Sequence, residues 1–503
     1  MATQTLNTPR TLEDVLAMGN IEEKIKYLKA GRRTPLPDTA QNLKDWNPLL
    51  HDIMDEEKNP KIRVLVEMEH NTTYEDADGN VHTSHQPPKY EKKEPNRIAL
   101  PIEQDIVNIQ TSFTVGTEPS LNCHPNDDKE KGLFLAIRQT MKRNKLKYQN
   151  RKIVRKWLSE QDVAEYWYVV EDSGFWQKLK KKVADMFGVK VPPKYRLSSQ
   201  LWSPFLGDTI YPFFDEQGNY RACSREYKVK DLDGKERVCF MCVTSESVFV
   251  WECGVSGWEL NTSQTILKHN LGECPVMYAH RDQSYTAKIR PLRERLEKCL
   301  SGYADCIDYH FFPLLMLFGD IDPNVRGGDA RNRMMQLTGE GADARYLTWS
   351  QSSDPIKIEI ETYFNQCYAQ TNTPRISFDQ LKGVGNALSG TAFRYFFMAA
   401  HMAVMNHGEV LGEFFQRRVN FLCRALGRLN VSFADASQTI DVETEIVPYI
   451  IDSTDDKVKT ATAAVSGGVW SLEAGVAYCN DYGEVSDEIE RLKEDKPQEA
   501  ESE

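Results

Sequence analysis

Apolar residues recur every three or four positions in several stretches of the chain, which is the spacing of an amphipathic helix. These stretches span residues 11–30, 102–115, 285–309, 354–370, 391–429 and 455–464. Pro35 and Pro37 follow the first stretch and end it, and Gly116 stops the second. The stretch at 391–429 is the longest, and its aromatic stripe is typical of a packed core rather than of a cofactor site.

Strand-like runs separated by turn residues fill two other regions. Between Tyr195 and His280 the runs alternate with turns such as Glu216-Gln217-Gly218-Asn219 and Asp231-Leu232-Asp233-Gly234. This pattern predicts an antiparallel sheet built from hairpins. Near Val64–Tyr90, the turn Asp78-Gly79-Asn80 predicts a further, exposed hairpin. Shorter strands are expected at 313–318 and 439–450.

Length and charge limit the possible classes of protein. The 503 residues exceed what one compact core usually holds, so two to four units are expected. With 40% hydrophobic residues the chain can bury cores, and general disorder is excluded. The 74 acidic residues outnumber the 62 basic ones, giving a net charge of −12, which argues against a protein that coats nucleic acid.

The ends of the chain and its cysteines add little chemistry. We find neither a leader pattern nor an apolar run long enough for a membrane span, so secretion and membrane insertion are not expected. The 11 cysteines are scattered and are expected to be free thiols. Residues 481–503 carry ten Asp or Glu against three Lys or Arg, a net −7 that predicts a partly disordered acidic tail.

One basic block stands out against this acidity. Between positions 131 and 157 there is no Asp or Glu, and the cations are Lys131, Arg138, Lys142, Arg143, Lys145, Lys147, Arg151, Lys152, Arg155 and Lys156. They could contact phosphate or an acidic partner. Alternatively, they form the solvated face of a helix that packs through Leu133, Ile137, Met141 and Ile153, and this stripe favours the second interpretation.

The glycine and cysteine motifs of the chain do not indicate an enzymatic activity. Gly385 and Gly390 have the spacing of a phosphate-binding loop, but Thr391 stands where its lysine must be, so the glycines indicate a flexible loop. Cys239 and Cys242 form a C-x-x-C without a second tight pair. Because they alternate between the two faces of a strand, core cysteines are favoured over a zinc site. We find no nucleophile motif.

The order of these elements resembles the portal proteins of tailed double-stranded DNA bacteriophages, most closely the siphophage type. The segments that carry the resemblance are Asn96-Arg97, Val115-Gly116-Thr117-Glu118-Pro119, Cys274-Pro275-Val276, Thr338-Gly339-Glu340-Gly341 and Lys382-Gly383-Val384-Gly385-Asn386-Ala387-Leu388-Ser389-Gly390. They occur in order across most of residues 60–495. The region 130–211, which includes the basic block, departs most from the pattern.

The resemblance implies an α+β portal-type fold with a β-rich wing, a two-helix stem, a small clip insertion, a long wing helix and a helical crown. The implied units are an N-terminal helical segment (1–60), the wing (61–280, with its β-rich part at 195–280), stem helices (281–310 and 354–373), the clip (311–353), a tunnel loop (374–389), the long wing helix (390–430), a wing strand (431–452), and the crown with the acidic tail (453–503).

It also implies a non-enzymatic role. The family forms a ring, with a dodecamer expected, at one capsid vertex, and the ring is the conduit for DNA packaging and ejection. The implied partners are duplex DNA bound without sequence preference, the terminase large subunit, a head-tail adaptor, and capsid and scaffolding proteins. No cofactor, metal or membrane is implied. The protein would belong to the virion, after assembly in the host cytoplasm.

Two sets of residues correspond to the contact sites of the family. The tunnel loop would face DNA with Gln380, Lys382, Gly383, Gly385 and Asn386. Of these, Gln380, Lys382 and Asn386 would touch the phosphate backbone. The clip would meet the motor and later the adaptor with Arg326, Arg331, Arg333 and Arg345. Solvated loop charges are the alternative explanation for these arginines.

Two other functions stay open at this stage, a neck or head-completion adaptor and an unrecognised nucleic-acid-processing enzyme. Adaptors are typically much shorter chains, which counts against the first. The acidity fits a conduit, because a wall with few cations holds DNA weakly and lets it slide. Since the tail accounts for −7 of the charge, residues 1–480 carry only −5.

Overall fold

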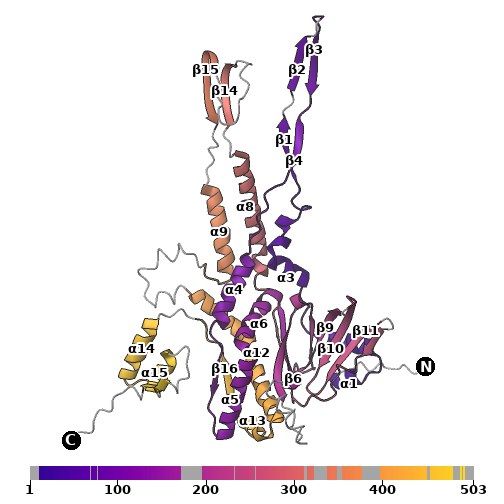
Figure 1. Cartoon of the computed structure of the whole chain (residues 1–503), viewed down its shortest axis with the longest axis vertical. Coiled ribbons are helices and arrows are strands. Elements are labelled where there is room, and N and C mark those ends of the chain that lie inside the picture. The colour runs from indigo at the N-terminus through magenta and orange to yellow at the C-terminus, as the bar shows by residue number, and fades with distance from the viewer. Residues whose placement is uncertain are drawn as a thin grey trace, which may run out of the picture.

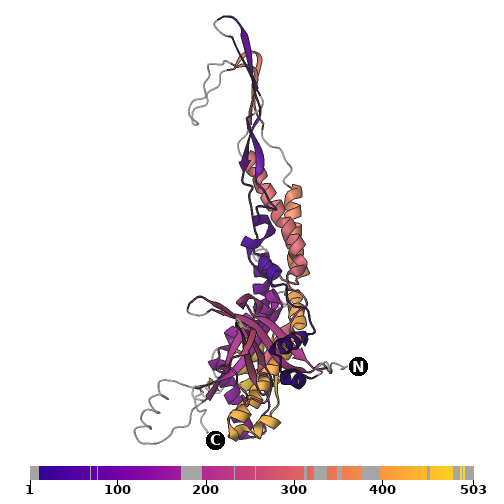
Figure 2. The ribbon, with the colours of Figure 1, turned by 90° about the vertical axis from the view of Figure 1, so that its right-hand side faces the viewer.

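A long projection rises from a body of sheets and helices in the computed structural model of the chain (Figure 1; Figure 2 shows it from the side). The structure describes residues 11–67, 70–75, 78–171, 195–230, 233–254, 257–310, 314–321, 337–347, 354–375, 397–449, 454–479, 488–489 and 491–492.

The body contains the antiparallel sheet that the turn pattern predicts. Its strands are β8 (Thr209–Phe214), β9 (Tyr220–Lys230), β10 (Glu236–Val243), β11 (Val248–Gly254) and β12 (Gly257–Leu260), and each pairs with the next along the chain. Gly218 in the first turn has a φ of 90° and Gly234 in the second a φ of 80°. Glycine adopts this left-handed backbone without steric cost, so the turn residues fix the hairpins.

A second, three-stranded sheet was not expected from the sequence. It consists of β13 (Val276–His280), β6 (Asp162–Glu171) and β7 (Tyr195–Trp202), with β6 in the centre. The first six residues of β6 are all buried. A strand that is covered on both faces lacks the polar alternation by which half-exposed strands are recognised.

The body has three main cores, two between helices and a sheet and one between the two sheets. The largest joins α4 (Ile102–Val115), α5 (Asp128–Arg143), α6 (Leu146–Glu160) and α12 (Met398–Leu429) to the three-stranded sheet. In β10, Met241 and Val243 point into the core between the sheets, whereas Phe240 and Cys242 face the N-terminal helices. The alternation expected for the cysteine-bearing strand is therefore confirmed.

The N-terminal stretch 11–30 forms two helices rather than the one expected. They are α1 (Leu12–Ala17) and α2 (Ile21–Ala30). The side chain of Asn20 accepts hydrogen bonds from the backbone N–H groups of Glu22 and Glu23. This N-cap starts a new helix, so the break depends on one residue that the apolar spacing does not reveal.

The basic block likewise spans two helices, α5 and α6, and not one. Lys145 between them has a left-handed φ of 54°. Leu133, Ile137 and Ile153 are buried in the large core, which confirms the predicted packing stripe. Most cations of the block point to solvent, and those that are exposed are Lys131, Arg138, Lys142, Arg143, Lys145, Lys147, Arg151, Lys152 and Arg155.

The projection consists of a helix pair and three two-stranded ladders. Its elements are α8 (Arg290–His310), α9 (Asp354–Gln370), β14 (Leu314–Ile321) paired with β15 (Leu337–Leu347), β1 (Ile62–Glu67) paired with β4 (Lys89–Lys93), and β2 (His70–Glu75) paired with β3 (Val81–Gln86). Both expected helices and the hairpin at Asp78-Gly79-Asn80 are confirmed. The helix expected from 285 begins only at Arg290, after the 3-10 turn η4 (Ala287–Ile289).

The remaining elements complete the body and the C-terminal part. They are α3 (Thr39–Trp46), η1 (Pro48–Leu50), η2 (Asp52–Met54), η3 (Pro204–Leu206), η5 (Val431–Phe433), α13 (Ala436–Thr439), β5 (Ser120–Cys123), β16 (Val442–Glu445), α14 (Thr454–Ser466) and α15 (Leu472–Cys479). The strand expected at 439–450 is limited to β16, because the chain up to Thr439 is helical. Among the described helices, none combines the length and apolarity needed to cross a membrane.

Candidate functional site: the projection and its root

Helix α9 carries apolar side chains that a single chain covers only in part. Of its 17 residues only Cys367 is buried. Its large apolar side chains are Ile356, Ile358, Ile360, Tyr363, Phe364 and Tyr368. Ile358 is 64% exposed, and Ile307 on the neighbouring α8 is also exposed. A helix normally gains its stability by burying such a face, so α9 has only part of its packing partners here.

The strand ladders of the projection are open on both faces where their burial is described. All residues of β3 and of β4 are exposed. A two-stranded ladder on its own is marginally stable in water. Arg63 stacks on the ring of Tyr90 at 4.0 Å, which covers one position of the β1–β4 pair. The ladders therefore lack the hydrophobic backing that the body sheets have.

A buried ion network, which we call the root, fixes the base of α8. Its members are Asp45, His51, Glu103, Arg293 and Glu297, all nearly inaccessible to solvent. The Arg293 guanidinium donates to Glu103 at 2.9 Å, to Glu297 at 3.2 Å and to Asp45 at 3.2 Å. His51 Nδ1 lies 2.6 Å from Glu297. Burial raises the pKa of Glu103 despite the attraction of Arg293.

The root ties three distant segments together. Asp45 lies on α3, Glu103 on α4, and Arg293 with Glu297 on α8. Arg290 adds a further pair with Asp45 at 2.5 Å. Because removal of one partner would leave buried charges uncompensated, the arrangement of these helices is strongly specified. The sequence analysis missed these residues, and only the i, i+4 spacing of Arg293 and Glu297 could have pointed to them.

A second buried pair anchors α12 to the body. Arg418 donates to Glu165 of β6 at 2.6 Å and to the side-chain oxygen of Asn150 on α6 at 2.7 Å. Both charged side chains are almost completely buried. The long helix is thus held by an ion pair in addition to its apolar stripe.

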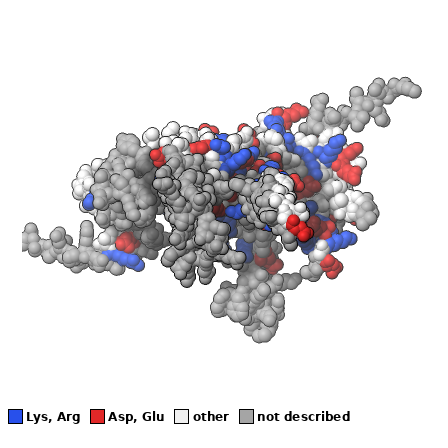
Figure 3. Space-filling view, turned by 90° about the horizontal axis from the view of Figure 1, so that it is seen from above, with Lys and Arg blue, Asp and Glu red and all other residues white. Residues whose placement is uncertain are grey.

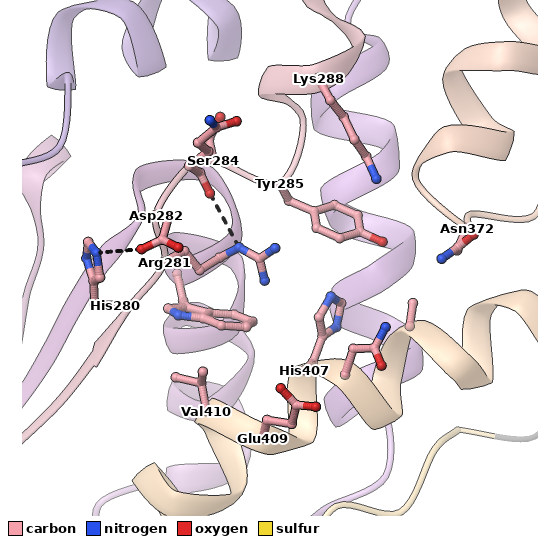
Figure 4. Close-up of a pocket in the computed structure, with 14 residues that line it drawn as sticks. His280, Arg281, Asp282, Ser284, Tyr285, Lys288, Asn372, His407, Glu409 and Val410 are labelled. Atoms are coloured by element: carbon pink, nitrogen blue, oxygen red, sulfur yellow. Dashed lines mark hydrogen bonds and ion pairs between the residues drawn. The ribbon is translucent and has the colours of Figure 1, made fainter. Parts of the chain in front are cut away.

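A pocket lies where the projection joins the body, and we call it the junction pocket. It has a volume of about 720 Å³ and is lined by the loop after β13, by α6, by α12 and by Asn372 after α9. In Figure 4, Arg281, Lys288, Asn372 and His407 converge on the space beside the ring of Tyr285. Helix α9 and α8 both meet the body here.

Burial lowers the pKa of three basic side chains in the junction pocket. The pKa of Arg281 and that of Lys288 are both lowered, chiefly by loss of solvation. Burial, assisted by Arg281, also lowers the pKa of His407 to about 3, so this imidazole stays neutral at ordinary pH. The Arg281 guanidinium packs over Trp157 at 4.6 Å and over Tyr285 at 5.2 Å.

The residues predicted for DNA and motor contact are only partly located. Gln380, Lys382, Gly383, Gly385 and Asn386 lie outside the described residues, as do Arg326, Arg331 and Arg333. Arg345 is on β15, opposite Met316 of β14.

The structure does describe the flanks of the predicted tunnel loop. On one side Arg375 donates to the side chain of Asn365 at 3.0 Å and stacks on Phe364. On the other side Phe397 is buried against Phe113. The segment between them is therefore attached to the projection at one end and to the body at the other.

The cysteine pair has the chemistry of core residues. Cys239 and Cys242 are buried, and burial raises the pKa of Cys239 and raises that of Cys242 to about 11. Zinc binds the thiolate, which these environments disfavour. Within the described ranges no cluster of three or more metal-ligating side chains is found, and all 11 cysteines are free thiols.

Surface charge is mixed rather than segregated on the face seen from above. Figure 3 shows Lys and Arg interspersed with Asp and Glu among the described residues of that face. Interspersed charge of both signs does not create the strong positive field that duplex DNA requires for tight binding.

Comparison with solved structures gives distant similarity. The neck of a native gene transfer agent particle, computed with C12 symmetry, is 12% identical and covers 76% of this chain and 90% of that chain, with a TM-score of 0.37. The neck of the empty particle, computed with C6 symmetry, gives the same values. The virion of the native particle gives 11% identity over 74% of this chain and 85% of that chain, with a TM-score of 0.34.

Comparison of the sequence with models of protein families identifies one family. A search of curated proteins finds no match. The sequence model described as "Phage portal protein, SPP1 Gp6-like" matches residues 38–502, which is most of the chain. That family is structural and non-enzymatic. The matched range includes the projection and the body except α1 and α2, and the chain therefore belongs to the SPP1 Gp6-like family of phage portal proteins.

Proposed function

We propose that copies of this chain assemble into a ring at one vertex of a phage capsid, and that duplex DNA enters and leaves through the ring. The observation that carries the proposal is helix α9, with one buried residue and six large apolar side chains that are not fully covered. Neighbouring copies standing side by side would cover this helix. Contacts of this head-to-tail kind close into a ring when the rotation between copies allows it.

The free energy available from such contacts is large. Full burial of one Ile, Phe or Leu side chain contributes about 1.5–3 kcal/mol, of which Ile358 would gain the larger part and each half-buried side chain of α9 a fraction. The open strand ladders of the projection support the same arrangement, because lateral neighbours would supply the backing that they lack. We expect the ring to be a dodecamer.

In this assembly the helices α8 and α9 form the stem, and the β14–β15 ladder beyond them forms the clip (Figure 1). We propose that the clip binds the terminase motor during packaging and head-tail connector proteins afterwards. Its position at the far end of α8 and α9, away from the body, supports this role. Arg326, Arg331, Arg333 and Arg345 would offer cations to an acidic partner.

The body would be the wing, and α14 with α15 would belong to the crown that faces the capsid interior. Capsid and scaffolding proteins would contact the ring during assembly in the host cytoplasm, and the finished ring would stay in the virion.

The segment between Arg375 and Phe397 would form the tunnel loop. We propose that Gln380, Lys382 and Asn386 face the DNA, with Gly383 and Gly385 giving the loop its conformational freedom. Few cations and an acidic chain would leave the duplex free to slide in either direction. The variant Lys382→Glu should therefore reduce DNA packaging by assembled particles while ring formation is kept. Unchanged packaging would show that this lysine does not take part.

Ring formation is tested directly by electron microscopy and mass photometry of the purified chain. Closed rings with a central hole are expected. Monomers or dimers at every salt concentration would contradict the proposal. Ile358→Asp should prevent ring closure, because it places a charge on the uncovered face of α9. Leu206→Asp is a matched control, since Leu206 in the body is 60% exposed and lies outside the projection.

A further inference from the structure

The junction pocket contains a guanidinium, that of Arg281, which forms no direct ion pair with any described residue. Among the described residues, no carboxylate lies within ion-pair distance of Arg281, and its only hydrogen bond runs from Nε to the backbone oxygen of Gln283 at 3.4 Å. The two terminal nitrogens are left to face the cavity. These nitrogens are not among the fully buried unpaired atoms, so water reaches them in the single chain, and a carboxylate could take the place of that water.

Further donors point into the same space. Figure 4 shows Lys288 directed toward it from η4, the short turn before α8, and Asn372 from the segment just after α9. Neither side chain has a hydrogen-bond partner within the part of the chain that the structure describes. Asn372 also holds a left-handed φ of 46°, a conformation that places its side chain at the pocket.

The wall of the pocket contains buried polar atoms that are also unsatisfied. They are Trp157 Nε1, Ser284 Oγ and His407 Nε2. The hydroxyl of Thr114 donates its one hydrogen to Gln110 at 2.7 Å, so its 3.2 Å contact with His407 Nδ1 requires that Nδ1 donates. His407 Nε2 is then an acceptor. Besides the acceptor of His407 and the carboxylates of Asp282 and Glu409, the lining thus offers cations and donors, and these suit a single carboxylate carried on a polypeptide.

Two acidic side chains stand at the rim. Asp282 is exposed and pairs with His280 at 3.6 Å, and Glu409 is exposed on α12. They would repel an extended polyanion such as duplex DNA. A single carboxylate on a protruding side chain could still reach the fork of Arg281, which matches a carboxylate with two parallel hydrogen bonds.

An apolar strip leads to the pocket along α12. Met398, Met402, Met405 and Glu409 follow at i, i+4, i+7 and i+11, so they share one face of the helix, and Glu409 also lines the pocket. All three methionines are exposed, Met405 by 72%. Exposed methionine next to a recessed arginine is the composition of a protein–protein interface and not of a DNA contact.

We propose that the methionine strip and the junction pocket together receive a second copy of this chain, which inserts an acidic side chain between Arg281 and Lys288. This inference rests on the proposed ring, because only a ring brings a second copy to every pocket. Local charge complementarity supports it, since among the described residues neither Arg281 nor Lys288 has a carboxylate within ion-pair distance, and an acidic side chain of the second copy would supply one. The contact would connect the foot of the projection in one copy to its neighbour.

Carbodiimide coupling tests the contact in the unmodified protein, because it joins a lysine amine to a carboxylate at contact distance. Rings are assembled from a mixture of ¹⁴N- and ¹⁵N-labelled chains, coupled, and digested for mass spectrometry. We expect Lys288 to be joined to an Asp or Glu in pairs of mixed label. Coupling of Lys288 only within one chain, for example to Glu409, or no coupling in intact rings, would overturn the inference.

The variant Arg281→Met removes the charge and keeps an unbranched side chain over Trp157. The subunit concentration at half-assembly should rise at least about tenfold, because one partner of a buried charge pair is lost. Lys152→Met is the control, since Lys152 is an exposed cation on α6 without a described partner. Circular dichroism checks that the variants fold.

The outcomes separate this inference from the proposed function. If wild-type protein forms no rings, both are wrong. If rings form and Arg281→Met assembles as readily as wild type, only the pocket contact is wrong. If Arg281→Met assembles normally and instead loses DNA binding, the pocket serves a nucleic acid, and the inference is also wrong.

Discussion

Helix α12 in the body buries 14 of its 32 residues, whereas α9 in the projection buries one of 17. Both helices show the apolar periodicity of packed helices. The difference is that α12 finds its partners within the same chain, together with the ion pair between Arg418 and Glu165. Helix α9 finds only α8 and a few residues near its end. The body therefore finds its packing partners within one chain, whereas the projection leaves part of its apolar surface open, and the proposed ring would cover this surface.

The largest effect should come from breaking the buried pair of the body. Arg418→Met leaves the carboxylate of Glu165 buried and uncompensated, so the free energy of unfolding should fall by about 3–5 kcal/mol. Urea unfolding at a subunit concentration that keeps the chain monomeric measures this. Arg417→Met is the control, because Arg417 forms only an exposed pair with Glu413. Equal effects of the two changes would contradict the comparison.

The second prediction concerns the loss of stability at low pH, through His407 in the junction pocket. His407 has its pKa lowered to about 3, so below its ordinary value of 6.5 the unfolded chain binds a proton that the folded chain does not. Stability should be complete above pH 6.5 and be lost as the pH falls, by about 1.4 kcal/mol per pH unit. His407→Gln should remove this dependence. A variant with the same acid sensitivity as wild type would exclude His407 as its source.

The smallest effect is expected on the projection. Ile358→Ala should change the stability of the monomer by less than about 0.5 kcal/mol, because the side chain is already 64% exposed. Leu411→Ala is the matched change in the body and should cost about 2–5 kcal/mol, since Leu411 is fully buried. Urea unfolding of both variants compares them. A similar loss in both would mean that α9 is already packed in the single chain.

Local patterns predicted those elements whose signals lie close together in the sequence. The bounds of α9 at Asp354 and Gln370 and the hairpins around Gly218 and Gly234 follow from apolar spacing and turn chemistry. The strand β6 was missed, because burial on both faces removes its alternation. The breaks at Asn20 and Lys145 were missed, because a cap or a single left-handed residue ends a helix without interrupting the apolar pattern.

The residues of the candidate site could be predicted from local sequence patterns only to a small extent. The root unites Asp45, Glu103 and Arg293, which lie on three helices and are brought together only by the fold. In the junction pocket, Arg281 and Asn372 are likewise far apart in the sequence. The family resemblance gave the class of protein, which the match over residues 38–502 confirms. Of the residues it suggested for contact, only the backbone of Arg345 is placed, on β15.

The root also has a mechanical consequence. Helix α8 has 21 residues, and the part from Arg293 to His310 is a lever about 25 Å long whose fulcrum is the set of charges around Arg293. A tilt of about 5° at the fulcrum would shift the far end of the helix by about 2 Å. Because each of those charges has a short, directional partner, small tilts meet an elastic restoring force. Loads applied at the tip would thus be transmitted to the body as strain and returned when the load is released.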